Sequence, residues 1–246
     1  MKTGLVSISF RKLKVHEIAS LAAKCGLAAV EWGGDVHVPL GDTKAAREAL
    51  RITREEGLMV ATYGSYVRMK KEDRASFTAL VDTARALQAP AIRVWAGTDV
   101  NDSVEEIAES TQLLCDMAPE MIVTFESHFR TITETAEGGK ALLTMIDRPN
   151  ARSQWQPGYN LEGSMPMDQC LAFIETMRPW LYNVHVYSWE GTVRLPLEAH
   201  ADRWKHYLRA LAGERCALLE FVQDDDPVNL VRDAKVLHRW IEELKI

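Results

Sequence analysis

Polar residues of the kinds that bind metals stand near the ends of apolar runs in the second half of the chain. The run MIVTFESHF, residues 121–129, carries Glu126 and His128 close to its end. Residues two apart in a strand face the same way, so we expect these two side chains to share one face. Burying a carboxylate costs several kcal/mol unless the charge is paired. Glu126 is therefore expected to serve in a salt bridge or in a metal or catalytic site.

The same pattern recurs in the apolar runs that follow. Gln156 comes 30 residues after Glu126, His185 comes 29 residues after Gln156, and Glu220 comes 35 residues after His185. Each interval is close to the length of one strand–helix unit, so the four side chains would converge from adjacent strands. Two carboxylates, an imidazole and an amide oxygen suit a divalent cation such as Mn²⁺, Mg²⁺ or Co²⁺. Each residue alone is as often structural as functional, and it is their shared register that predicts a metal site.

Strand and helix signals alternate along the chain, as they must to position these residues. The predicted strands cover residues 4–10, 28–32, 58–63, 91–96, 121–129, 151–156, 181–189 and 216–222. The predicted helices cover residues 15–24, 43–56, 71–87, 133–146, 168–177, 201–212 and 227–246, and another begins at Ser103. Eight such units predict a single (β/α)₈ TIM-barrel domain over residues 1–246. The alternative, a doubly wound open sheet, would need a Gly-rich turn after the first strand, and ISFRKLK contains none.

Charge and composition exclude several classes of function. A net charge of −6 and a pI near 5.7 argue against a nucleic-acid-binding surface. The four cysteines form no CxxC pair, which indicates reduced thiols rather than disulfides or a zinc knuckle. The sequence shows neither a signal peptide nor an apolar run of the ~20 residues that span a bilayer. We therefore expect a cytoplasmic protein without nucleic-acid or membrane partners, whose exposed apolar helix faces leave a homo-oligomer open.

Seven short segments occur in an order and at a spacing that are typical of a known family. The chain resembles the xylose isomerase-like TIM-barrel superfamily, in its sugar phosphate isomerase/epimerase group. The segments that carry the resemblance are AVEWGGDVHV, YGSYVR, IRVWAG, TFESH, WQPGYN, NVHVYSW and LLEFV. The resemblance implies that a Glu, an Asp, a His and a second Glu bind one divalent metal, Mn²⁺ before Mg²⁺, Co²⁺ or Zn²⁺. These positions fall on Glu126, Gln156, His185 and Glu220.

Two positions depart from the family pattern. Gln156 replaces the aspartate, and Tyr159 stands where the family often has a substrate-binding histidine. An amide keeps an oxygen ligand but removes a negative charge, so we expect weaker metal binding and a more strongly Lewis-acidic ion. A site without metal is the alternative.

The resemblance implies a sugar isomerase or epimerase, with Glu126 and Glu220 as both metal ligands and the acid/base pair. Such a reaction removes a proton beside a carbonyl and returns one to the other face. Barrel enzymes place their chemistry at the C-terminal ends of the strands. The further residues that we expect at the substrate are His37, Arg93, Trp95, His128, Tyr159 and Trp189. For Arg93 an ion pair with Glu126 is the alternative, and Arg68 and Lys70 are expected at the surface.

The substrate is expected to be a small, unphosphorylated keto sugar or polyol. Barrels usually bind phosphate with a Gly-rich loop after the seventh or eighth strand, and SWEGTVR and VQDDDPVN are not of that type. A lyase or dehydratase acting on 3-keto sugars or C-glycosides is the first alternative, because it would use the same metal and glutamate pair. A non-catalytic sugar-binding barrel is the second, and a DNA repair nuclease is disfavoured by the acidic pI.

Overall fold

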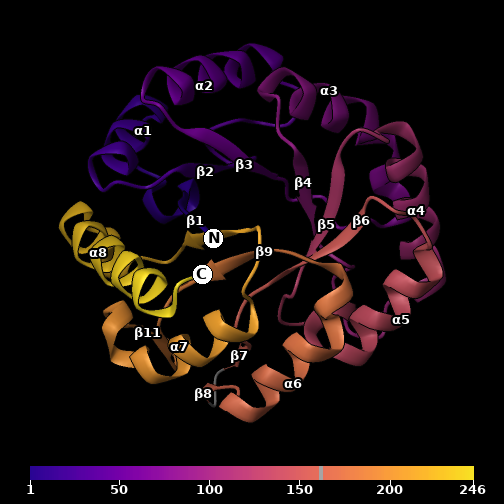
Figure 1. The fold of residues 1–246 in the computed structure, drawn as a ribbon. Helices are drawn as coiled ribbons and strands as arrows, with labels where there is room; N and C mark the ends of the chain where they lie inside the picture. The colour runs from indigo at the N-terminus through magenta and orange to yellow at the C-terminus, as the bar shows by residue number, and fades with distance from the viewer. Residues whose placement is uncertain (161–162) are drawn as a thin grey trace.

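The architecture is that of a closed barrel of parallel strands inside a ring of helices (Figure 1). The structure is a computed structural model that describes the backbone of residues 1–160 and 163–246 and the side chains of residues 1–158 and 165–246. Around the barrel the strands follow the order β1-β12-β9-β6-β5-β4-β3-β2. The TIM-barrel prediction is confirmed.

The barrel strands and the helices alternate in the chain. The strands are β1 (Lys2–Val6), β2 (Ala29–Gly33), β3 (Met59–Gly64), β4 (Ala91–Val94), β5 (Ile122–Glu126), β6 (Ala151–Trp155), β9 (Leu181–Val186) and β12 (Cys216–Leu219). The helices are α1 (Val15–Lys24), α2 (Thr43–Glu55), α3 (Phe77–Leu87), α4 (Val104–Met117), α5 (Ala136–Ile146), α6 (Met167–Met177), α7 (Ala201–Ala210) and α8 (Pro227–Leu244). Two short antiparallel pairs, β7 (Tyr159–Asn160) with β8 (Gly163–Ser164) and β10 (Trp189–Glu190) with β11 (Val193–Arg194), follow β6 and β9.

Side-chain caps fix where several helices begin. The side chains of Asp42, Ser103, Thr135 and Asp226 each accept a hydrogen bond from a backbone N–H in the first turn of the helix that follows. Such caps satisfy N–H groups that have no partner within the helix. Each helix then turns an apolar face to the barrel, and the larger core lies between the strands and this helical ring. None of the helices that the structure describes has both the length and the apolar character that a bilayer crossing requires.

Several strands end earlier than predicted, and this decides where polar side chains point. β1 stops at Val6 and continues as a 3₁₀ turn, Ser7–Phe10. β5 stops at Glu126, so His128 belongs to a loop and does not continue the inward face of the strand. β12 stops at Leu219, and the chain turns away at Phe221, whose φ is +49°. Beyond β1 and β12 the chain still buries apolar side chains such as Phe10 and Val222, so the apolar run extends past the end of the strand.

The interior of the barrel is polar in its middle layer. A small apolar cluster of Val6, Ile8, Ala29, Ala61, Cys216 and Leu218 fills only part of it. Polar side chains occupy the rest, among them Glu31, Arg93, Gln154 and His185, each 2% exposed or less. TIM-barrel interiors are usually filled by branched apolar side chains, so these four residues need a reason to be there.

Candidate active site

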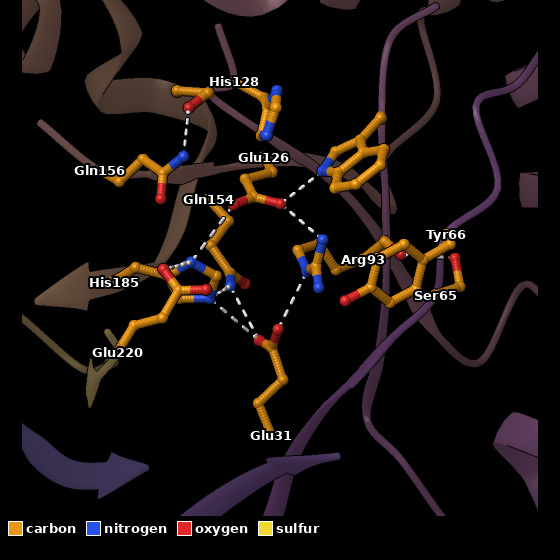
Figure 2. Close-up of polar contacts among 12 residues, drawn as sticks. Glu31, Ser65, Tyr66, Arg93, Glu126, His128, Gln154, Gln156, His185 and Glu220 are labelled. Atoms are coloured by element: carbon orange, nitrogen blue, oxygen red, sulfur yellow. Dashed lines mark hydrogen bonds and ion pairs between the residues drawn. The ribbon is translucent and has the colours of Figure 1, made fainter. Parts of the chain in front are cut away.

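Three ionisable side chains converge at the C-terminal ends of the strands. Glu126 ends β5, His185 lies in β9 and Glu220 directly follows β12, and all three are buried. Each offers a ligand atom within 4.8 Å of the others. Nδ1 of His185 lies 3.2 Å from Oε2 of Glu220 and 3.5 Å from Oε1 of Glu126. Figure 2 shows the three groups facing one another.

Gln156 lies beside this cluster, one residue past β6. Its Nε2 donates a hydrogen bond to the carbonyl oxygen of Ser127 at 2.9 Å. The other end of the amide, Oε1, points toward the cluster in Figure 2. The structure thus brings all four sequence-predicted ligand residues into one region, with Gln156 in a loop rather than at a strand end.

The hydrogen-bonding state of these groups fits a divalent cation. Nδ1 of His185, Oε2 of Glu220 and Oε1 of Gln156 are buried and make no well-aligned hydrogen bond with any residue that the structure describes, although Nδ1 and Oε2 face each other at 3.2 Å. Buried polar atoms normally have partners, and one shared ion would satisfy all three. Carboxylate oxygens, imidazole nitrogens and amide oxygens are all found as ligands of divalent cations such as Mn²⁺ and Zn²⁺. Glu126, His185 and Glu220 therefore form a candidate metal site.

A second layer of polar residues lies beneath the cluster. Arg93 donates from Nε to Glu31 at 2.9 Å and from Nη1 to Glu126 at 2.5 Å. Nε2 of Gln154 lies 2.8 Å from Glu31 and 2.5 Å from Nε2 of His185. Nε2 of His185 is also 3.3 Å from Oε2 of Glu31. This layer holds Glu126 and His185 from below (Figure 2).

Glu31 and Gln154 were not among the predicted site residues, although the sequence carries a signal for each. Glu31 is a carboxylate within the apolar segment AVEWG, the same kind of context that singled out Glu126. Gln154 precedes Gln156 by two residues and so shares its face. The predicted metal ligands were taken from strand ends, whereas the side chains of Glu31 and Gln154 lie within their strands.

The buried charges of this region shift one another's pKa values. Burial alone would raise the pKa of Glu31, but the nearby charges of His185 and Arg93 lower it to about 2. Arg93 and His185 likewise hold the pKa of Glu126 far below its usual value, against the effect of burial. Burial alone would lower the pKa of His185, but Glu220 and Glu31 raise it well above its usual value. The same excess of carboxylates that favours a proton on His185 favours a cation beside it.

The predicted substrate residues near Glu126 form an aromatic group at the mouth. The indole Nε1 of Trp95 donates to Oε2 of Glu126 at 2.5 Å. The ring of His128 packs on Trp95 with the centroids 4.7 Å apart, and its Nδ1 lies 2.8 Å from the carbonyl oxygen of Phe129. Arg93 makes the predicted alternative, the ion pair with Glu126.

The structure describes the contacts of two of the other predicted substrate residues, His37 and Trp189. His37 is buried, with Nδ1 3.0 Å from Oγ of Ser7 and Nε2 3.1 Å from the carbonyl oxygen of Leu13, so it is no solvated loop histidine. Trp189 packs against Phe221 with the ring centroids 4.9 Å apart. The side chain of Tyr159 lies outside the described residues.

Several solved structures share the fold of this chain. The probable 3-DHS dehydratase AsbF from Bacillus anthracis superposes with a TM-score of 0.78 at 19% identity, over 97% of this chain and 99% of that one. D-Psicose 3-epimerase from Clostridium cellulolyticum H10 gives 0.74 at 14% identity, over 99% of each chain. The 3-keto-D-glucoside 4-epimerase YcjR from E. coli gives 0.71 at 15% identity, over 97% of this chain and 99% of that one.

At such identities the likeness concerns the fold. Among curated proteins, none matches the chain significantly in sequence. The model of one protein family, however, matches residues 19–212, which is most of the chain. The chain therefore belongs to the xylose isomerase-like TIM-barrel family.

Proposed function

We propose that this protein is a metal-dependent sugar isomerase or epimerase that transfers a proton next to the carbonyl of an unphosphorylated keto sugar or polyol. The observation that carries the proposal is the convergence of two buried carboxylates, Glu126 and Glu220, on His185. The epimerases among the structural neighbours, whose names specify D-psicose and a 3-keto-D-glucoside, support a small carbohydrate as the substrate.

Glu126, Gln156, His185 and Glu220 would hold the ion, for which Mn²⁺ is the first choice. The ion supplies electrophilic stabilisation of the negative charge that develops on the substrate's carbonyl oxygen. One glutamate would accept the proton from the carbon, and the other would donate a proton to the opposite face of that carbon. Their environments differ as two such roles require. Arg93 and Trp95 both donate to Oε2 of Glu126, whereas Oε2 of Glu220 faces Nδ1 of His185 at 3.2 Å and makes no well-aligned hydrogen bond with a described residue.

A lyase or dehydratase on 3-keto sugars or C-glycosides is the second candidate. It would begin with the same proton removal and continue with loss of a leaving group from the next carbon. Gln156 favours it, because an amide at this position departs from the aspartate of the sugar epimerases that the sequence resembles. The likeness in fold to a 3-DHS dehydratase is in keeping with this alternative.

Proton exchange in D₂O separates these functions. The protein is freed of metal, reloaded with Mn²⁺ and incubated with keto sugars while NMR follows the exchange of C–H protons and the products. Exchange with an epimeric product supports the first proposal, whereas release of water or an aglycone supports the second. Glu220→Gln should abolish exchange, and the control Glu120→Gln, at an exposed surface ion pair, should leave it unchanged. A protein that binds sugar but neither takes up Mn²⁺ nor exchanges any proton is a non-catalytic barrel, and both proposals fail.

A further inference from the structure

The chain after β3 continues the barrel wall above Glu126. Although β3 ends at Gly64, Ser65 donates its backbone N–H to the carbonyl oxygen of Arg93 at 3.1 Å. Further on, the N–H groups of Trp95 and Gly97 donate to the carbonyl oxygens of Val67 and Arg68 at 2.9 and 2.8 Å. Residues 65–68 therefore run beside residues 93–97 and rise from the candidate site toward the mouth.

Alternate side chains along this segment belong to the inner face. A Cβ on Gly64 would lie 2.8 Å from both Nη2 of Arg93 and Oε1 of Glu31, so Gly64 faces the interior. Two residues later the ring of Tyr66 contacts that of Trp95, with the centroids 5.2 Å apart. Two residues later again, Cζ of Arg68 lies 4.3 Å from the centroid of the same indole ring. Arg68, which we expected at the surface, is thus half-buried on the ring that donates to Glu126.

The charge of Arg68 is not used within the described part of the protein. The nearby acids are occupied: Asp73 accepts from the backbone N–H groups of Arg68 and Lys70, and Asp102 pairs with the Lys70 ammonium at 2.7 Å. No carboxylate or carbonyl of a described residue accepts a hydrogen bond from the guanidinium. Stacking on an indole holds the planar guanidinium in place while its N–H edge stays free to bind a planar anion.

We propose that Arg68 binds a carboxylate group of the substrate, so that the preferred substrates are keto sugar acids rather than neutral keto sugars. This inference rests on the proposed function. The guanidinium and the Glu126 carboxylate both contact Trp95, so a substrate at Glu126 has the Arg68 guanidinium across one indole ring. A single guanidinium edge matches a carboxylate in a bidentate pair. A phosphate group usually has several cations or backbone N–H donors around it, and here Lys70 is already paired with Asp102.

A matched pair of ligands tests the inference. 2-Keto-D-gluconate and D-fructose share their carbon chain and their C2 ketone, and they differ at C1, which is a carboxylate in one and a hydroxymethyl group in the other. Binding to the Mn²⁺-loaded protein is measured by calorimetry, and exchange of the C3 proton is followed in D₂O by NMR. We expect the acid to bind roughly 10- to 100-fold more tightly, as a charge-assisted hydrogen bond allows.

Variants of Arg68 identify the source of that preference. Arg68→Gln should remove the preference while D-fructose and Mn²⁺ bind as before, and Arg68→Lys should retain part of it. Arg47→Gln, on the exposed face of α2, is the control and should change nothing. Melting temperatures of all variants verify that they fold.

The outcomes distinguish the inference from the proposed function. Equal binding of the two ligands, or a preference that survives Arg68→Gln, overturns the role of Arg68 while proton exchange still supports the function. Tighter binding of D-fructose 6-phosphate than of 2-keto-D-gluconate overturns the choice of a carboxylate. Absence of exchange with every ligand in the Mn²⁺-loaded protein overturns the proposed function, and the inference falls with it.

Discussion

Replacing Arg93 by methionine tests whether the polar layer inside the barrel is held together by charge balance. Arg93 is 2% exposed and is the cation shared by Glu31 and Glu126, which are 0% and 4% exposed. Methionine fills a similar volume but leaves both carboxylates without their guanidinium. Removing one partner of a buried ion pair costs about 3–5 kcal/mol, because the remaining charge stays desolvated. We expect Arg93→Met to lower the free energy of unfolding of the metal-free protein by that amount.

The matched control is Arg85→Met. Arg85 also pairs with a glutamate, Glu120, at 2.8 Å, but both side chains are about half exposed. Exposed pairs of this kind contribute about 0–1 kcal/mol. Urea unfolding of wild type and both variants, without metal and at one pH, gives the two differences directly. If Arg93→Met costs no more than Arg85→Met, the buried charges are not balanced in the way that the contacts indicate.

Two additions sharpen this experiment. In the double variant Glu31→Gln/Arg93→Met only one carboxylate is left without its partner, so part of the lost stability should return. Mn²⁺ should also reduce the deficit of Arg93→Met, because a divalent ion beside Glu126 replaces the missing positive charge. Saturation at 100 times the dissociation constant contributes about 2.7 kcal/mol to either protein, so the deficit shrinks only as far as the variant binds Mn²⁺ more tightly than wild type does. A deficit that grows when Mn²⁺ is added would contradict a cation site at Glu126.

Three further substitutions test, one at a time, the close packing, the charge and the hydrogen bonds of the barrel interior. Gly64→Ala places a methyl group 2.8 Å from Nη2 of Arg93 and should cost about 1–3 kcal/mol in urea unfolding, whereas Gly139→Ala, a helical glycine beside a flexible methionine, should not destabilise. Gln156→Glu should tighten Mn²⁺ binding about 10-fold in a calorimetric titration, because it adds a charge to the donor set, and weaker binding would place Gln156 outside that set. Asn183→Ala removes two buried hydrogen bonds and should cost about 1–3 kcal/mol of stability with Mn²⁺ affinity unchanged.

The alternation of strands and helices could be predicted from the sequence because strands and helices differ in the spacing of their apolar residues and because capping residues mark where helices begin. The ends of the strands could not. A strand ends where its neighbour stops supplying hydrogen bonds, and in β5 the last pairing joins Glu126 to Gln154. Ser127, His128 and Phe129, which the prediction included in the strand, belong to a loop. No local pattern distinguishes such a loop from three more residues of strand.

The sequence predicted the residues that meet at the strand ends but not Glu31 and Gln154, which lie beneath them. Glu126, His185 and Glu220 were found because a register of one βα unit is visible in a linear sequence. Glu31 was missed because its partners are separated from it by 62 residues in the case of Arg93 and 154 in the case of His185. Arg68 was expected at the surface, together with Lys70. That its guanidinium stacks on Trp95 depends on how residues 65–68 continue the barrel wall.

The polar layer follows from placing a histidine of the candidate metal site inside the barrel. When Nδ1 of His185 faces the two glutamates, its Nε2 is turned into the interior, where an apolar filling would leave it without a partner. Glu31 supplies that partner at 3.3 Å, and its own charge then needs Arg93. Arg93 in turn reaches Glu126, so the contacts return to the group from which they began. Each member of this cycle is there because of the one before it, which is why a carboxylate in the middle of β2 belongs to the same site as one at the end of β5.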